Sequence, residues 1–123
     1  MLREAIYLVE SGVCCYEDVD RSLRNDLGSW IALTGLFRFI DITGVRGYET
    51  VMKDLNKELC NSPNVPKLMT DLVATGARGI SNHHGFYSYT PESAKMWEDK
   101  FIKFNYDIRK LIGKHLHGEG DQD

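Results

Sequence analysis

Two adjacent histidines, His83 and His84, are the first residues of this chain that could do chemistry. Imidazole nitrogens are common metal ligands, but paired ligands on a helix usually stand four residues apart on one face. Neighbouring histidines point in different directions, and the residues around them add no further cluster of ligands. The pattern therefore favours a pair of surface-loop histidines, and we predict no metal site.

Three cysteines, Cys14, Cys15 and Cys60, raise the question of thiol chemistry. No Cys-x-x-Cys spacing is present, so the sequence holds neither a zinc knuckle nor a thioredoxin-type motif. An odd number with two adjacent members favours reduced thiols, as in a cytosolic compartment. Because no base or cationic cluster stands beside Cys14 and Cys15, we interpret them as small, buried or half-buried spacers after a helix rather than as nucleophiles.

A short apolar segment, residues 35–45, holds the next candidate. Leu36, Phe37 and Ile40 recur at helical spacing, so we expect one short helix that buries this face. Gly44 is placed to end it, because glycine adopts positive φ angles readily. We expect the other helices to pack around this segment.

Asp41 lies beside the last turn of that helix. A carboxylate there meets the unfavourable end of the helix dipole. It could act as a general base or orient a substrate, although a cap or an ion pair with Arg38 or Arg46 is favoured. The sequence contains no Ser/His/Asp set, P-loop or Gly-x-Gly-x-x-Gly fingerprint, so the residues alone predict a helical domain without a complete active site.

Composition is that of a soluble globular domain. Of 123 residues, 42% are hydrophobic and 27% are charged, and the net charge is −3. This charge gives no indication of nucleic-acid binding or of an anionic membrane partner. No run reaches the roughly 18 apolar residues of a membrane span, and no signal peptide is recognisable. We therefore expect a cytoplasmic protein with no nucleic acid and no membrane among its partners.

The periodicity of apolar residues predicts an all-α fold. Besides the 35–45 segment, helices are expected over residues 1–11, 16–28, 48–59, 65–75 and 90–115. The first apolar face is in register at once after Met1, with no N-cap before it, so we expect a piece of a longer protein. We expect residues 117–123 to form a disordered tail.

Residues 76–90 interrupt the helical pattern with glycines and polar side chains, and Phe86, Tyr87 and Tyr89 suggest a short extended piece. Thr90 and Pro91 then have the types preferred at the start of a helix. Within this last helix, a heptad seam repeats at spacings of 4, 3, 4 and 3, typical of packing against another helix, on Trp97, Phe101, Phe104, Ile108 and Leu111.

Three motifs, in this order, resemble the C-terminal domain of the 3-hydroxyacyl-CoA dehydrogenase family. The first runs from Leu-Arg-Glu-Ala at residues 2–5 through Glu-Asp-Val-Asp at residues 17–20. The second is Gly-Leu-Phe at residues 35–37 with Asp-Ile-Thr-Gly at residues 41–44. The third is Gly-Phe-Tyr-Ser-Tyr at residues 85–89. The resemblance covers residues 1 to about 90.

This resemblance implies an all-α domain of the 6-phosphogluconate dehydrogenase C-terminal-like type, over residues 1–116. In the family such a domain follows a Rossmann domain that binds most of the NAD, and it closes over an acyl-CoA substrate and forms a homodimer. We expect that Rossmann domain to be absent from this chain. Hydride passes between the C3 hydroxyl carbon and NAD. The acid–base His–Glu pair and the assisting Ser and Asn would all lie before Met1, so no catalytic residue is expected here.

Three departures from the family pattern point to a divergent branch. A proline becomes Leu36, a cofactor-contacting lysine aligns with Ser81, and a glycine aligns with His83. The sugar-acid (gulonate-type) dehydrogenases and lambda-crystallin group therefore stay open, as does a non-catalytic dimeric helical module. The residues expected to face substrate or cofactor are Asp41, Ser81, Asn82 and His84.

Overall fold

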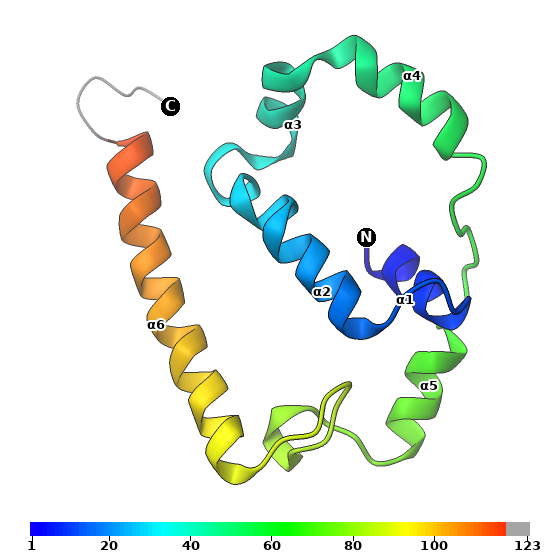
Figure 1. Cartoon of the computed structure of the whole chain (residues 1–123), viewed down its shortest axis with the longest axis vertical. Coiled ribbons are helices and arrows are strands. Elements are labelled where there is room, and N and C mark those ends of the chain that lie inside the picture. The colour runs from blue at the N-terminus through cyan, green and yellow to red at the C-terminus, as the bar shows by residue number, and fades with distance from the viewer. Residues whose placement is uncertain (118–123) are drawn as a thin grey trace. The chain divides into compact units, whose positions relative to one another are not determined.

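The computed structural model describes residues 1–117, and the described residues form helices joined by turns (Figure 1). The helices are α1 (Leu2–Glu10), α2 (Tyr16–Asn25), α3 (Ile31–Thr43), α4 (Val45–Leu55), α5 (Lys67–Ala74) and α6 (Pro91–Leu116), with 3-10 turns at Leu27–Ser29 and Ile80–Asn82. The predicted all-α class is confirmed. None of the described helices is both long and apolar enough to cross a bilayer.

The chain divides into two compact units, Met1–Pro66 and the part from Lys67 onward. Each is described by itself below. The expectation of one helical domain over residues 1–116 stays a prediction, and residues 118–123 of the expected tail lie outside the described residues.

In the first unit, local signals set the ends of α1 and α2. The α1 helix is followed by Gly12 at φ 75°, a conformation that glycine adopts without strain. The α2 helix begins where Asp18 accepts a hydrogen bond from the Cys15 backbone N–H at 3.3 Å. It ends at Asn25, earlier than predicted, because Leu27 lies in the following 3-10 turn.

The α3 helix differs most from its prediction. It begins at Ile31 rather than Gly35, and Gly35 breaks it with φ 70° and ψ −170°. Across this kink the Trp30 ring stacks on the Phe39 ring, with centroids 3.5 Å apart. The helix ends at Gly44 as predicted, at φ 117°.

The expected burial of the face formed by Leu36, Phe37 and Ile40 is wrong within this unit, because Phe37 is 81% exposed. The α4 helix starts directly after Gly44, and a one-residue link is too short for α4 to fold back over α3. Within the first unit, α4 therefore does not cover this segment as expected.

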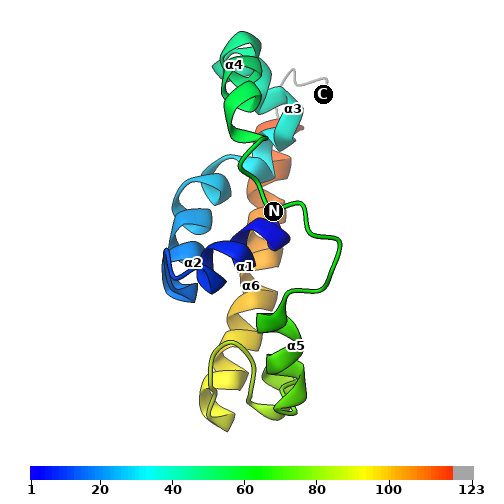
Figure 2. The same cartoon turned by 90° about the vertical axis from the view of Figure 1, so that its right-hand side faces the viewer.

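Two hydrogen bonds tie α1 to the segment that follows α4, which passes close to α1 (Figures 1 and 2). The Cys60 backbone N–H donates to Glu4 Oε2 at 2.8 Å. The Arg3 guanidinium donates to the carbonyl oxygen of Ser62 at 3.2 Å. Because these partners are more than fifty residues apart in sequence, the two bonds close the first unit.

In the second unit, α6 begins as predicted. The Thr90 hydroxyl accepts from the Ser93 backbone N–H at 3.0 Å, while Ser93 Oγ accepts from the Thr90 backbone N–H at 2.9 Å. Pro91 occupies the first helical position. Ala94 is buried in the first turns of the helix, but most of the heptad seam is exposed.

We predict that Glu4→Ala lowers the free energy of unfolding by about 1–2 kcal/mol, because a half-buried charged acceptor is lost from the Cys60 amide. Urea denaturation measures the change, and hydrogen exchange at the Cys60 amide should accelerate. Glu58→Ala is the matched control, since Glu58 is exposed in the turn after α4. Equal losses in both variants would contradict a closing role for Glu4.

Candidate functional site

Three of the four predicted site residues, Ser81, Asn82 and His84, lie in one loop of the second unit, residues 76–89. We call it the 76–89 loop. The fourth, Asp41, lies on α3 in the first unit, where it is exposed. The loop is therefore the place where the sequence-based candidates come together.

Backbone hydrogen bonds fold the 76–89 loop back on itself. The His84 N–H donates to the Gly79 carbonyl at 3.0 Å, and the Gly79 N–H donates to the His84 carbonyl at 2.8 Å. The Tyr89 N–H reaches the carbonyl of His83 at 3.0 Å, and His84 also bridges to Ser88. The expected extended aromatic piece thus consists of isolated bridges rather than a strand within the described residues.

Two glycines allow the two arms of this loop to approach closely. Gly79 has φ 90° and ψ −144°, a region open mainly to glycine. A Cβ atom added to Gly85 would stand 3.1 Å from the Gly79 Cα. His83, which aligns with a glycine in the resemblance described above, adopts a left-handed conformation at φ 62°. Histidine tolerates this conformation better than most residues, although it is strained.

The Asn82 amide is used inside the loop. Its Oδ1 accepts from the Arg78 backbone N–H at 3.0 Å, and its Nδ2 donates to the Gly76 carbonyl at 2.8 Å. These bonds make Asn82 a residue that shapes the loop. Ligand recognition would have to come from its neighbours.

The imidazole of His84 contacts a hydroxyl at the end of α5. Its Nε2 lies 3.1 Å from Thr75 Oγ1, which also donates to the Leu72 carbonyl at 2.6 Å. Since that hydroxyl proton points to Leu72, it is the His84 ring that donates when Nε2 carries a proton. No group of three His, Cys, Asp or Glu side chains in the described part of the chain could hold a metal ion.

Ser81 differs from its neighbours in the loop. It lies in the 3-10 turn Ile80–Asn82, its side chain is exposed, and its hydroxyl makes no hydrogen bond within residues 1–117. Of the three candidates in the loop, Ser81 is therefore the one best placed to meet a ligand.

A second feature, which we did not predict, is a groove of about 320 Å³ between α1 and α2. It is mostly apolar and is lined by Met1, Glu4, Ala5, Leu8, Cys14, Asp18, Val19, Ser22 and Leu23. Among the lining residues at the start of the chain, the apolar Met1, Ala5 and Leu8 recur at helical spacing, so this pattern could have indicated the α1 wall. The pairing with α2 required the structure.

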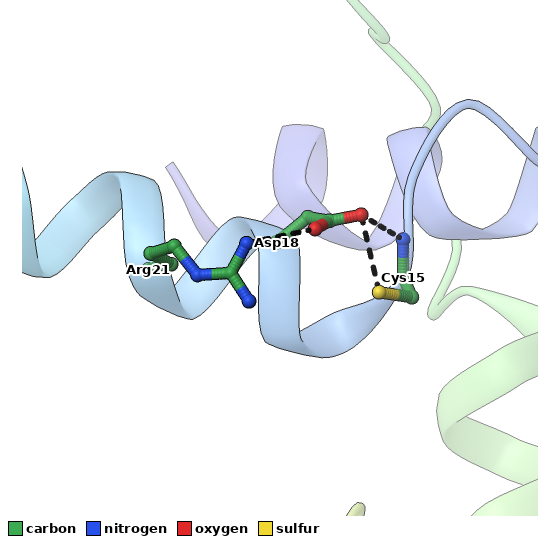
Figure 3. A network of polar contacts seen from close by, with 3 residues as sticks. All are labelled: Cys15, Asp18 and Arg21. Atoms are coloured by element: carbon green, nitrogen blue, oxygen red, sulfur yellow. Dashed lines mark hydrogen bonds and ion pairs between the residues drawn. The ribbon is translucent and has the colours of Figure 1, made fainter.

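At the edge of this groove, Cys15, Asp18 and Arg21 form a polar network (Figure 3). The Cys15 thiol donates to Asp18 Oδ2 at 3.1 Å, and Arg21 lies 3.5 Å from Asp18 Oδ1. The bond to Asp18 raises the pKa of the Cys15 thiol, while the same bond lowers the pKa of the Asp18 carboxyl. A thiol with a raised pKa is a poor nucleophile, which agrees with the expectation that Cys15 is not one. The expected burial is wrong for Cys15, which is exposed at the start of α2, while Cys14 is half-buried.

Comparisons with known proteins extend this description. Residues 1–89 match the family described as 3-hydroxyacyl-CoA dehydrogenase, C-terminal domain. The chain is 30% identical over 112 residues to 5-formyl-3-hydroxy-2-methylpyridine 4-carboxylate 5-dehydrogenase of Mesorhizobium japonicum, covering 91% of this chain and 36% of the relative. A crystal structure of a 5-formyl-3-hydroxy-2-methylpyridine 4-carboxylic acid 5-dehydrogenase, described as an NAD⁺-dependent dismutase, matches with TM-score 0.77 and 31% identity, over 98% of this chain and 37% of that chain.

We predict that Asp18→Asn lowers the pKa of the Cys15 thiol, because the carboxylate that stabilises the protonated thiol is lost. In a Cys14→Ser, Cys60→Ser background, alkylation of Cys15 by iodoacetamide should then proceed faster at pH 8, and the midpoint of its pH profile should move to lower pH. Mass spectrometry of the tryptic peptide measures the rate. Arg24→Gln, one turn beyond Arg21, should leave the profile unchanged, and an unchanged profile for Asp18→Asn would contradict the assignment.

Proposed function

This chain belongs to the 3-hydroxyacyl-CoA dehydrogenase C-terminal domain family, and we propose that it forms the C-terminal helical part of an NAD-dependent dehydrogenase. The observation that carries the proposal is the family match across residues 1–89, which includes all three sequence motifs and the 76–89 loop. The chain spans about a third of the two dehydrogenases that it resembles, 36% of one and 37% of the other.

NAD would be bound mainly outside this chain, because the sequence holds no Gly-x-Gly-x-x-Gly fingerprint. Its role in such an enzyme is to accept or donate a hydride at the substrate carbon. The residues present can add a contact at most, and the 76–89 loop suits that task. Its closed backbone fixes the position of the turn, and its exposed Ser81 can meet a ligand.

Two substrate classes follow from different observations. The family description favours a 3-hydroxyacyl-CoA, as in fatty-acid metabolism. The similarity to the pyridine carboxylate dehydrogenase instead extends through α6, beyond the residues that match the family. This extent favours a small aromatic or sugar-type acid as the second candidate, consistent with the departures at Leu36, Ser81 and His83.

Self-association is the other part of the proposal. Large apolar side chains are exposed in both units, among them Leu2, Phe37, Phe101 and Phe104. A homodimer would cover such surfaces by placing the same patch of two copies together. The dimer would hold two substrate clefts in a fixed relation.

We predict that this chain alone has no dehydrogenase activity, because it carries neither the cofactor fingerprint nor the acid–base pair. The test compares it with the protein encoded by the uninterrupted reading frame around it. That protein should oxidise NADH with acetoacetyl-CoA, or reduce NAD⁺ with 5-formyl-3-hydroxy-2-methylpyridine 4-carboxylate, and the active substrate decides between the classes. Turnover by the isolated chain above a buffer control would overturn the proposal.

We further predict that Ser81→Lys tightens NADH binding by the full enzyme roughly ten- to a hundred-fold, the value of a charge-assisted hydrogen bond of about 1.5–3 kcal/mol. Fluorescence titration of NADH measures the affinity. Lys95→Ala on α6, where Lys95 pairs with Asp99 at 2.9 Å, is the control and should have no effect. If the affinity of Ser81→Lys matched that of the control, the loop would not face the cofactor.

A further inference from the structure

The seam of α6 is a continuous apolar row that the second unit leaves exposed. Trp97 is 52% exposed, Phe101 71%, Phe104 62% and Leu111 54%. With Phe101 in position a of a heptad, these side chains and Ile108 fill every a and d position from residue 97 to residue 111. The α6 helix also lies beyond the residues that match the family, so the family assignment gives no account of this row.

We propose that α6 pairs with α6 of a second copy as an antiparallel, two-fold symmetric coiled coil. The proposal gives the self-association proposed above a specific contact and therefore rests on it. In an antiparallel pair, a positions of one helix face d positions of the other. The register that we propose places Phe101 against Phe104 of the partner subunit and Trp97 against Ile108 of the partner subunit, each pair occurring twice.

The charges beside the seam select this arrangement. Positions g of the two heptads are Lys100 and Asp107, and positions e are Glu98 and Asn105. In the antiparallel register, Lys100 faces Asp107 of the partner subunit, again twice. In a parallel pair, Lys100 would instead face the partner subunit's Asn105, and no oppositely charged pair would form. The seam is therefore complementary to itself only when the second helix runs in reverse.

Both charged side chains are available for this contact. Asp107 Oδ2 forms an ion pair with Lys103 Nζ of its own helix at 2.8 Å, and this pair holds the carboxylate at the helix surface. The Lys100 ammonium lies 5.3 Å from the centre of the Trp97 ring, beside the seam. Each group thus stands next to the apolar row rather than on the opposite face.

The area of the row fits a specific contact. A fully covered aromatic side chain buries about 150–250 Å², so three half-exposed aromatic residues on each helix supply roughly 600 Å² per dimer. Ile108, Leu111 and the lysine stems add to this value. Specific protein interfaces begin at about 1,000 Å² in total, so the α6 pair can form most of one.

Sedimentation of charge variants of the whole chain tests the register. The unmodified chain should be a dimer at micromolar concentration. Lys100→Glu or Asp107→Lys should each weaken the dimer about tenfold, because two attractions become two repulsions. The double variant Lys100→Glu, Asp107→Lys exchanges the charges and should recover the dimer. Lys110→Glu, the same change at an outward-facing c position, should have no effect.

Cross-linking provides a second readout that does not depend on affinity. With the native cysteines replaced by serine, the variant Lys100→Cys, Asp107→Cys should give a covalent dimer with a short bis-maleimide. The variant Lys103→Cys, Lys110→Cys has the same spacing on the outer face and should remain monomeric. Far-UV circular dichroism of each variant checks that the helices are retained.

The outcomes separate the pairing from the function proposed above. The α6 pairing would be overturned if the double variant Phe101→Ala, Phe104→Ala still formed the dimer. It would also be overturned if the double variant Lys100→Glu, Asp107→Lys did not regain it. Self-association would then occur through another surface. Equal cross-linking at both cysteine pairs would overturn the α6 pairing as well. A clean monomer of the unmodified chain at ten times the concentration would reject self-association altogether, while dehydrogenase membership would stand on the activity test.

Discussion

One of the two hydrogen bonds that close the first unit is accepted by a carboxylate. Glu4 accepts the amide proton of Cys60, and this bond fixes α1 beside the segment after α4. Apolar packing offers little to replace it, since Ile6 is the one residue of this unit that is buried. The α1 wall of the groove between α1 and α2 is positioned by the same contact, because Glu4 also lines that groove.

Local signals were enough to predict where most helices begin and end. Thr90 and Pro91 begin α6, and glycines at positions 12 and 44 end α1 and α3, because a cap or a positive φ angle is decided by a few neighbouring residues. The kink at Gly35 was missed, since a glycine inside an apolar run is compatible with several conformations. The partner of Glu4 was out of reach, because the two residues are separated by most of the first unit.

The sequence predicted the 76–89 segment as an interruption between helices, but not the contacts inside it. Glycines and polar residues marked the 76–89 loop, and Ser81, Asn82 and His84 do share it. The sequence could not predict that the Asn82 amide forms two hydrogen bonds inside the loop, accepting one from the Arg78 N–H and donating one to the Gly76 carbonyl. The expected burial of Phe37 was also wrong, because burial depends on which element lies opposite the side chain. The one-residue link at Gly44 prevents α4 from lying opposite α3.

The close approach of Gly79 and Gly85 has a consequence for how this loop can change over generations. A methyl group on Gly85 would press against the Gly79 backbone, and Gly79 itself holds a conformation that side chains resist. A side chain at either position therefore strains the backbone of the loop, whichever ligand the loop binds. Ser81 lies in the turn between the two glycines with an exposed side chain, so a substitution there leaves this close approach intact.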